Sequence, residues 1–203
     1  MLWKMVSMAM LCCWSLPAWA ADPWCSPDGA SALTFEWLPK DTTNPSIGSV
    51  RIKDASGKAV QTLDDLESYY GDSESLNTST DFNNDSCPDL LLVHSKAPIG
   101  NENVRVFLYN AKAKRFEINE AVSELAGPSI DPDDKNCLIS SSKGGAEDVY
   151  SAKHCWNKGK LVIQSEYDIS PLYRDGKFQC FQHTSTVYRG GKKRTRTNCT
   201  KKF

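Results

Sequence analysis

The chain has 203 residues, with 24 basic and 25 acidic side chains and a formal net charge of −1. This near balance disfavours nucleic acid as the main partner, because nucleic-acid-binding domains usually carry a clear basic excess. The length suits one ordinary domain that buries a substantial core.

Residues 1–20 have the three-part pattern of a secretory signal peptide. Lys4 is the single charge near the start, residues 6–16 are apolar, and Ala18 and Ala20 supply small residues before a cleavage point. A membrane anchor would need about 20 apolar residues, more than this run contains. We therefore expect an exported chain, periplasmic or secreted, that forms a single domain over residues 21–203.

Six cysteines follow the signal segment, and an even number in an exported chain indicates disulfides. No two lie two to four residues apart, so zinc-ligand spacing is absent. Two pairs are nearly symmetrical about Gly-Gly turns, which would place their members on facing strands. The predicted pairs are Cys137–Cys155, Cys180–Cys199 and, by remainder, Cys25–Cys87.

The first half of the chain reads as strands. Residues 49–53 alternate between apolar and polar, residues 54–57 form a turn, and residues 59–63 continue the pattern, which predicts a hairpin. Residues 89–94 are almost continuously apolar and predict a buried strand. Alternation resumes in residues 104–110.

The second half repeats this pattern around one short helix. Apolar residues recur at helical spacing in residues 119–126. Two further hairpins are predicted, the second around Gly190–Gly191; their strands are residues 145–156 with 160–167, and 178–189 with 192–199. The fold class is therefore all-β and antiparallel, either a propeller-like series of small sheets or a β-sandwich.

Residues 81–89 form an acidic loop directly before the predicted buried strand. Oxygen-bearing side chains stand at loop positions one, three, five and nine, and position seven would offer a backbone carbonyl. Calcium takes six to eight oxygens, which such a loop can supply. Position twelve is Leu92, which excludes an EF-hand. The predicted calcium ligands are Asp81, Asn83, Asp85, Cys87 and Asp89; a solvated Asp/Asn turn is the alternative.

The acidic loop resembles the calcium loops of FG-GAP repeats, the blades of integrin-type β-propellers. Those loops read D-x-[DN]-x-D-G-x-x-D before an apolar strand. Here Ser86 replaces the glycine. A left-handed backbone at Ser86 would cost about 1 kcal/mol without removing any ligand.

A wider resemblance covers roughly residues 47–165. Segments 50–57, 60–62, 81–85 and 107–110 are followed by Phe116–Glu117 and Glu124–Leu125. In this order they resemble periplasmic immunity proteins that neutralise peptidoglycan-cleaving effectors of type IV secretion, which are similar to PliI-type lysozyme inhibitors. The resemblance implies a propeller-like, calcium-binding protein whose partner is a peptidoglycan hydrolase.

In lysozyme inhibitors of that type, a Ser-Gly loop with a nearby tyrosine enters the active-site cleft of the enzyme. The resemblance implies a counterpart here, although Lys143 separates the serines from the glycines. An ordinary hairpin tip is the alternative. The implied partner-binding residues are Ser141, Ser142, Lys143, Gly144, Gly145 and Tyr150.

No arrangement of residues predicts catalysis. The acidic groups at 64–67 and 131–134 are explained by turn chemistry at least as well as by a glycosidase pair. We therefore expect a binding protein and not an enzyme. The alternative to an inhibitor is a calcium-stabilised adhesion or scaffold module of the cell envelope.

The C-terminal stretch, residues 189–203, is strongly basic and contains no acid. Two interpretations remain open: lysines that protect an edge strand from aggregation, or a basic face that meets an acidic partner or an anionic lipid surface. The cations are Arg189, Lys192, Lys193, Arg194, Arg196, Lys201 and Lys202.

Overall fold

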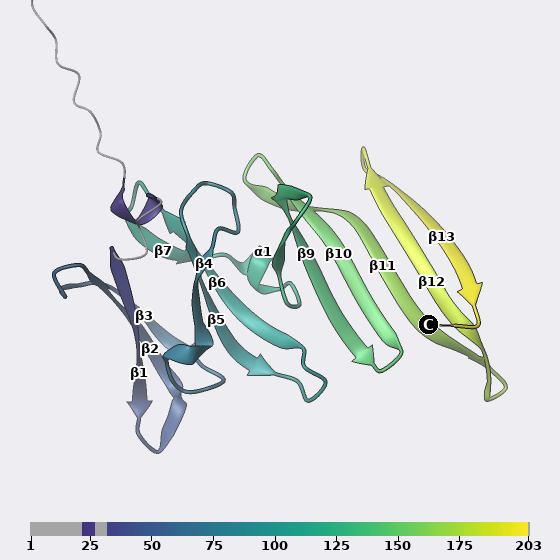
Figure 1. The fold of residues 1–203 in the computed structure, drawn as a ribbon, viewed down its shortest axis with the longest axis horizontal. Coiled ribbons are helices and arrows are strands. Elements are labelled where there is room, and N and C mark those ends of the chain that lie inside the picture. The colour runs from purple at the N-terminus through teal and green to yellow at the C-terminus, as the bar shows by residue number, and fades with distance from the viewer. Residues whose placement is uncertain (1–21, 27–31, 203) are drawn as a thin grey trace, which may run out of the picture.

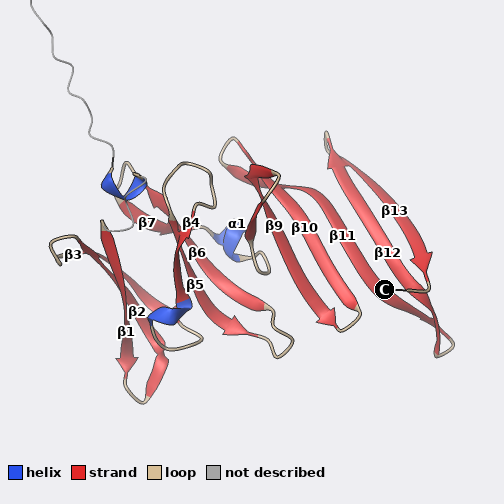
Figure 2. Ribbon diagram, in the orientation of Figure 1, coloured by secondary structure: helices blue, strands red, loops and turns tan. Residues whose placement is uncertain are grey.

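A computed structural model describes residues 22–26 and 32–202. The predicted signal peptide, residues 1–20, lies outside the described residues. Within them the chain forms thirteen strands, one α-helix and two short 3₁₀ turns, Pro23–Cys25 and Ser73–Ser75 (Figure 2). The strands form three antiparallel sheets, which confirms the all-β class and the prediction of small sheets built from successive hairpins.

Each sheet uses consecutive strands. The first contains β1 (Leu33–Asp41), β2 (Asn44–Asp54) and β3 (Ala59–Glu67). The second contains β4 (Leu76–Thr80), β5 (Asp89–Lys96), β6 (Glu102–Asn110) and β7 (Arg115–Ile118). The third contains β8 (Ser129–Asp131), β9 (Asp134–Gly145), β10 (Asp148–Asn157), β11 (Lys160–Arg174), β12 (Lys177–Arg189) and β13 (Lys192–Thr200). Figure 1 shows the three sheets in an open row.

The middle sheet is buried on both faces. On β6, Phe107 and Tyr109 pack with the first sheet, in a cluster that includes Val50 and Ile52. The alternate residues Val104 and Val106 pack on the opposite side, toward helix α1 (Glu120–Ser123) and the third sheet. Successive side chains of a strand point to opposite faces, so one strand serves two cores. This explains the nearly continuous apolar run that begins at Asp89.

The helix is shorter than predicted. The pattern covers residues 119–126, whereas the helix spans Glu120–Ser123. Asn119 is its N-cap, and its side-chain oxygen accepts a hydrogen bond from the amide of Val122 at 3.0 Å. Val122 is fully buried in the core between the middle and third sheets.

The hairpin β12–β13 and the disulfides agree with the prediction, whereas the turn between Cys137 and Cys155 lies at Ala146–Glu147 and not at Gly144–Gly145. Gly190 and Gly191 both have positive φ, 54° and 74°, between the paired strands β12 and β13. The three predicted disulfides are all present. Their Cα–Cα distances are 4.1 Å for Cys25–Cys87, 4.0 Å for Cys137–Cys155 and 5.6 Å for Cys180–Cys199.

Helices of a length and apolarity that could cross a bilayer do not occur among the described residues.

Candidate metal centre and partner surface

The acidic loop connects β4 to β5. Asn84 and Ser86 both adopt positive φ, 56° and 73°. Ser86 therefore has the left-handed backbone predicted for the position at which the resembling calcium loops carry glycine. This conformation costs a non-glycine residue roughly 1 kcal/mol, which other contacts of the loop must offset.

The carboxylates of Asp81 and Asp85 stabilise the loop by accepting hydrogen bonds from its backbone and side chains. Asp81 accepts hydrogen bonds from the amides of Asp85 at 3.2 Å and Ser86 at 2.8 Å. Asp85 accepts from the amide of Cys87 and from the side chain of Asn83, both at 2.9 Å. A carboxylate oxygen has more than one acceptor site, so these contacts leave lone pairs for a cation.

Asp89 has a different position, at the buried start of β5. Its side chain is fully buried and accepts hydrogen bonds from the amides of Phe82 at 2.7 Å and Tyr109 at 2.9 Å. Burial raises the pKa of Asp89 to about 7; the two hydrogen bonds oppose this shift, and repulsion from Asp81 and Asp85 adds to it. The loop therefore concentrates negative charge beside the core.

The possible metal-ligand atoms of this loop suit a hard cation. They are carboxylate and amide oxygens, which calcium prefers. None of the ion pairs among the described residues includes Asp81, Asp85 or Asp89, so no lysine or arginine balances their charge there. Asp89 is committed to two backbone amides, whereas Asp85 is exposed.

The carboxylates of Asp81, Asp85 and Asp89 are not among the closest clusters of possible metal-ligand atoms. Among the described residues, only Asp134, Cys137 and Cys155 bring three such ligand atoms within 4.8 Å of one another. The two cysteines are joined in a disulfide and therefore do not provide thiolate ligands.

The acidic loop joins three parts of the molecule. Trp24, next to the disulfide-bonded Cys25, donates its indole N–H to the carbonyl of Pro88 at 2.7 Å. Trp156 of β10 donates its indole N–H to the carbonyl of Phe82, also at 2.7 Å. The loop thus holds the N-terminal segment at one end and the third sheet at the other.

The predicted partner-binding loop is instead part of a strand. Residues 141–145 belong to β9, and the turn that follows is Ala146–Glu147. The prediction of a loop at Ser141–Gly145 is therefore wrong. Pairing with β10 extends to Gly145, opposite Asp148, although glycine is unfavourable in strands.

Asn101 fixes this end of β9 to the middle sheet. Its side-chain nitrogen donates to the carbonyl of Lys143 at 2.7 Å, and its side-chain oxygen accepts from the amide of Lys143 at 2.9 Å. One side-chain amide thereby satisfies both backbone groups of Lys143, as a neighbouring strand would. The sequence signalled only a polar turn residue after Gly100, so this contact could not be predicted.

A groove of about 430 Å³ lies beside the contact between Asn101 and Lys143. Its walls come from the turn between β5 and β6, from the end of β9, and from Gly127 and Val149. It brings Ser141, Ser142 and Lys143 together with residues that carry no recognisable motif in the sequence, namely Ile99, Gly100, Asn101 and Glu102. Ile99 is 41% exposed, so an apolar side chain is available next to serines and a lysine.

Tyr150 does not line this groove. It pairs with Ser142 across β9 and β10, whereas Lys143 pairs with Val149 and therefore lies on the opposite face. The hydroxyl of Tyr150 donates to Glu166 at 3.0 Å. Burial, together with this carboxylate, raises the pKa of Tyr150 to about 12. Gly144 and Gly145 also lie outside the lining of the groove.

Comparisons with known proteins place the fold. No protein-family model and no curated protein matches the chain. A solved structure described as a Xanthomonas type IV secretion system related protein is similar, with a TM-score of 0.56 and 15% sequence identity. The alignment covers 82% of this chain and 90% of that one. At this identity the similarity shows a shared fold.

Proposed function

We propose that the protein is an extracytoplasmic inhibitor or immunity protein that binds and blocks a peptidoglycan-degrading, lysozyme-like enzyme. The observation that carries the proposal is the groove beside Lys143. Asn101 holds the backbone of Lys143 at two points, and a preorganised surface loses less conformational entropy when a partner binds. The exposed Lys143, with the hydroxyl of Ser141 on the same face of β9, can hydrogen-bond the two carboxyl groups of a glycosidase cleft.

The resemblance and the shared fold support the same function. The sequence resembles immunity proteins against peptidoglycan-cleaving effectors of type IV secretion, and the Xanthomonas protein of similar fold is described as related to such a system. The three disulfides are compatible with an oxidising compartment such as the periplasm.

Calcium has a structural role in this proposal. Asp81, Asn83, Asp85 and the carbonyl of Cys87 would hold the ion, with Asp89 at the base of the loop. The cation would offset the repulsion that helps to raise the pKa of Asp89. Because the loop contacts both Trp24 and Trp156, its stabilisation would strengthen the attachment of the N-terminal segment and the third sheet.

The test of inhibition uses purified protein and lysozyme-like hydrolases acting on peptidoglycan. We expect the wild type to block at least one such enzyme. Lys143→Ala should weaken inhibition about 10- to 100-fold, the range of an interface hot spot, at an unchanged melting temperature. Lys135→Ala is the matched control, because Lys135 is an exposed lysine at the other end of β9. Equal inhibition by both variants would remove the groove from the proposed interface.

A further inference from the structure

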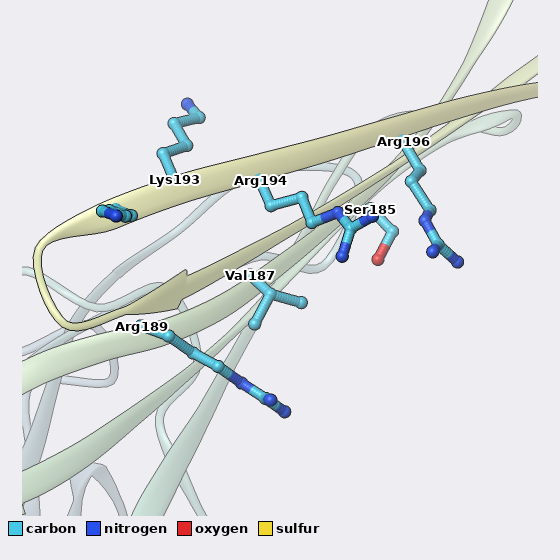
Figure 3. A pocket seen from close by; sticks show the side chains of 7 residues that line it. Ser185, Val187, Arg189, Lys193, Arg194 and Arg196 are labelled. Atoms are coloured by element: carbon cyan, nitrogen blue, oxygen red, sulfur yellow. The ribbon is translucent and has the colours of Figure 1, made fainter.

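One face of the hairpin β12–β13 carries a row of cations. Cross-strand partners share a face of a sheet, and the pairs here are Arg189 with Lys192, Val187 with Arg194, and Ser185 with Arg196. Figure 3 shows Arg189, Arg194 and Arg196 pointing to the same side as Val187, with Lys193 on the other side. These residues line a groove of about 560 Å³.

Nothing within the described residues neutralises this face. None of the ion pairs found there includes Arg189, Lys192, Arg194 or Arg196. On the neighbouring strand β11, Ser165 and Tyr167 share the face, because they pair with Val187 and Ser185. The intervening Glu166 lies on the opposite face.

On that opposite face, the carboxylate of Glu166 is engaged in two hydrogen bonds. The hydroxyls of Tyr188 and Tyr150 donate to its two oxygens at 2.5 and 3.0 Å. Lys193, which also faces that way, lies 5.6 Å from the centre of the Tyr188 ring. The sheet thus separates its charges, with the carboxylate on one face and the cationic row on the other.

This separation exceeds what protection of an edge strand requires. Charges on either face of β13 would prevent edge-to-edge pairing. Instead, three of its four cations share one face, while Lys193, Thr195 and Thr197 of the same strand lie on the other. The arrangement is therefore better explained by a ligand that contacts one face.

We propose that this cationic groove binds an extended, carboxylate-rich segment of a partner protein. Three of the four cations are arginines, whose planar guanidinium matches a carboxylate with two hydrogen bonds. Residues i and i+2 of a strand are about 7 Å apart, so Lys192, Arg194 and Arg196 match acids at alternate positions of an extended peptide. Val187, 37% exposed, offers an apolar contact between them.

A protein segment fits the groove better than a membrane surface. Interfacial membrane sites usually place Trp or Tyr beside their cations. Tyr188 lies on the opposite face, and the exposed Tyr173 of β11 and Phe178 of β12 lie at the far end, beside the turn between these strands. Tyr167 of β11 shares the face of the cations, but its hydroxyl is hydrogen-bonded to His183 and the residue does not line the groove. A groove also accepts a protruding chain more readily than a flat bilayer. This site does not depend on the proposed inhibition, which uses β9.

The test measures binding of a fluorescent peptide in which glutamate alternates with threonine, and of a second peptide with the same composition but consecutive glutamates. We expect the alternating peptide to bind more tightly. The variant R189Q/R194Q/R196Q should lose at least about tenfold in affinity for it. The control K112Q/K114Q/K158Q removes equal charge from exposed turns and should lose less than about twofold. Melting temperatures check that both variants fold.

Three results would overturn the proposal. Equal losses in the two variants would indicate nonspecific attraction. Tighter binding to phosphatidylglycerol-containing vesicles than to the peptide would indicate a lipid surface. Self-association of the wild type that the groove variant abolishes would indicate a second copy of the chain. Each result can occur whether or not the protein inhibits a hydrolase, so failure here is distinguishable from failure of the proposed function.

Discussion

Asp85 and Asp89 lie in one loop but differ in their surroundings. Asp85 is exposed, and its oxygens accept from Cys87 and Asn83. Asp89 is buried, and both its oxygens accept from backbone amides. The first side chain is therefore suited to binding an ion, and the second both to binding and to holding the loop against β6.

Substitution should separate these roles. Asp85→Asn keeps an oxygen acceptor but removes a charge, so it should abolish most of the increase in melting temperature produced by calcium and leave the EDTA-treated protein unchanged. Asp89→Asn places an amide NH₂ against a buried backbone N–H and should cost about 1–3 kcal/mol with or without calcium. Thermal unfolding of both variants, with calcium and with EDTA, measures the difference. A wild type that contains no calcium and does not respond to EDTA would contradict the structural metal.

Asp131 shows how a candidate catalytic acid is used structurally. It is buried, lies 2.5 Å from Lys153 and accepts a hydrogen bond from the amide of Asp133. The hydrogen bond from Lys153, the amide contacts and the nearby positive charge lower the pKa of Asp131. A group with a lowered folded pKa stabilises the protein above its unfolded pKa, and this stability is lost as pH falls through the folded pKa.

The pH dependence of Asp131→Asn follows. The variant should be less stable than the wild type by about 1–3 kcal/mol near neutral pH. The difference should begin to shrink as the pH falls below about 4, the pKa of the unfolded carboxyl, and should be smallest below the lowered pKa of the folded protein. Urea unfolding across this pH range measures it. A difference that stays constant down to the acid limit would mean that the charge of Asp131 does not matter.

Hairpins are the elements that the sequence predicts best. The turn at Gly190–Gly191 and the alternation of residues 49–63 are local signals, and both hairpins form. Local signals also place the acidic loop, and its resemblance to FG-GAP calcium loops accounts for the left-handed Ser86. The predicted loop at residues 141–145 is wrong because its conformation depends on pairing with β10 and on Asn101, which lies 42 positions away from Lys143 in sequence.

Two single side chains attach the third sheet to the rest of the molecule. Trp156 of β10 contacts the acidic loop, and Asn101, in the turn between β5 and β6, contacts β9. Trp156→Phe keeps an aromatic ring at the core but loses the N–H that donates to Phe82. We expect a loss of about 1–2 kcal/mol, since the carbonyl of Phe82 loses a partner. Chemical denaturation measures the cost. Trp37→Phe, which removes the N–H bond to the carbonyl of Pro45, is the control for a loss that does not involve the loop.

At the scale of the molecule, burial is unequal among the sheets. The middle sheet has a core on each face, whereas every residue of β13 before Thr200 is exposed. The period-two patterns of the sequence identify strands but not which sheets stack, because stacking depends on contacts between distant segments. The continuous apolar run of β5 was the one sign that a strand is covered on both sides.

Hydrogen exchange should therefore follow a gradient across the molecule. Amides of β5 and β6 should exchange slowest, near the rate of global unfolding, and those of β13 fastest among the strands. Exchange followed by mass spectrometry resolves these segments. Equal protection of β13 in the isolated protein would show that its face is covered by another copy.

The two indoles at the ends of the acidic loop give the protein an internal optical reporter. Trp24 and Trp156 donate to the carbonyls that bracket the loop, and outside residues 1–20 the only other tryptophan is Trp37. Indole emission responds to its hydrogen bonding and surroundings. The proposed binding of calcium can therefore be tested by titration of the intrinsic fluorescence, without a dye or an engineered label.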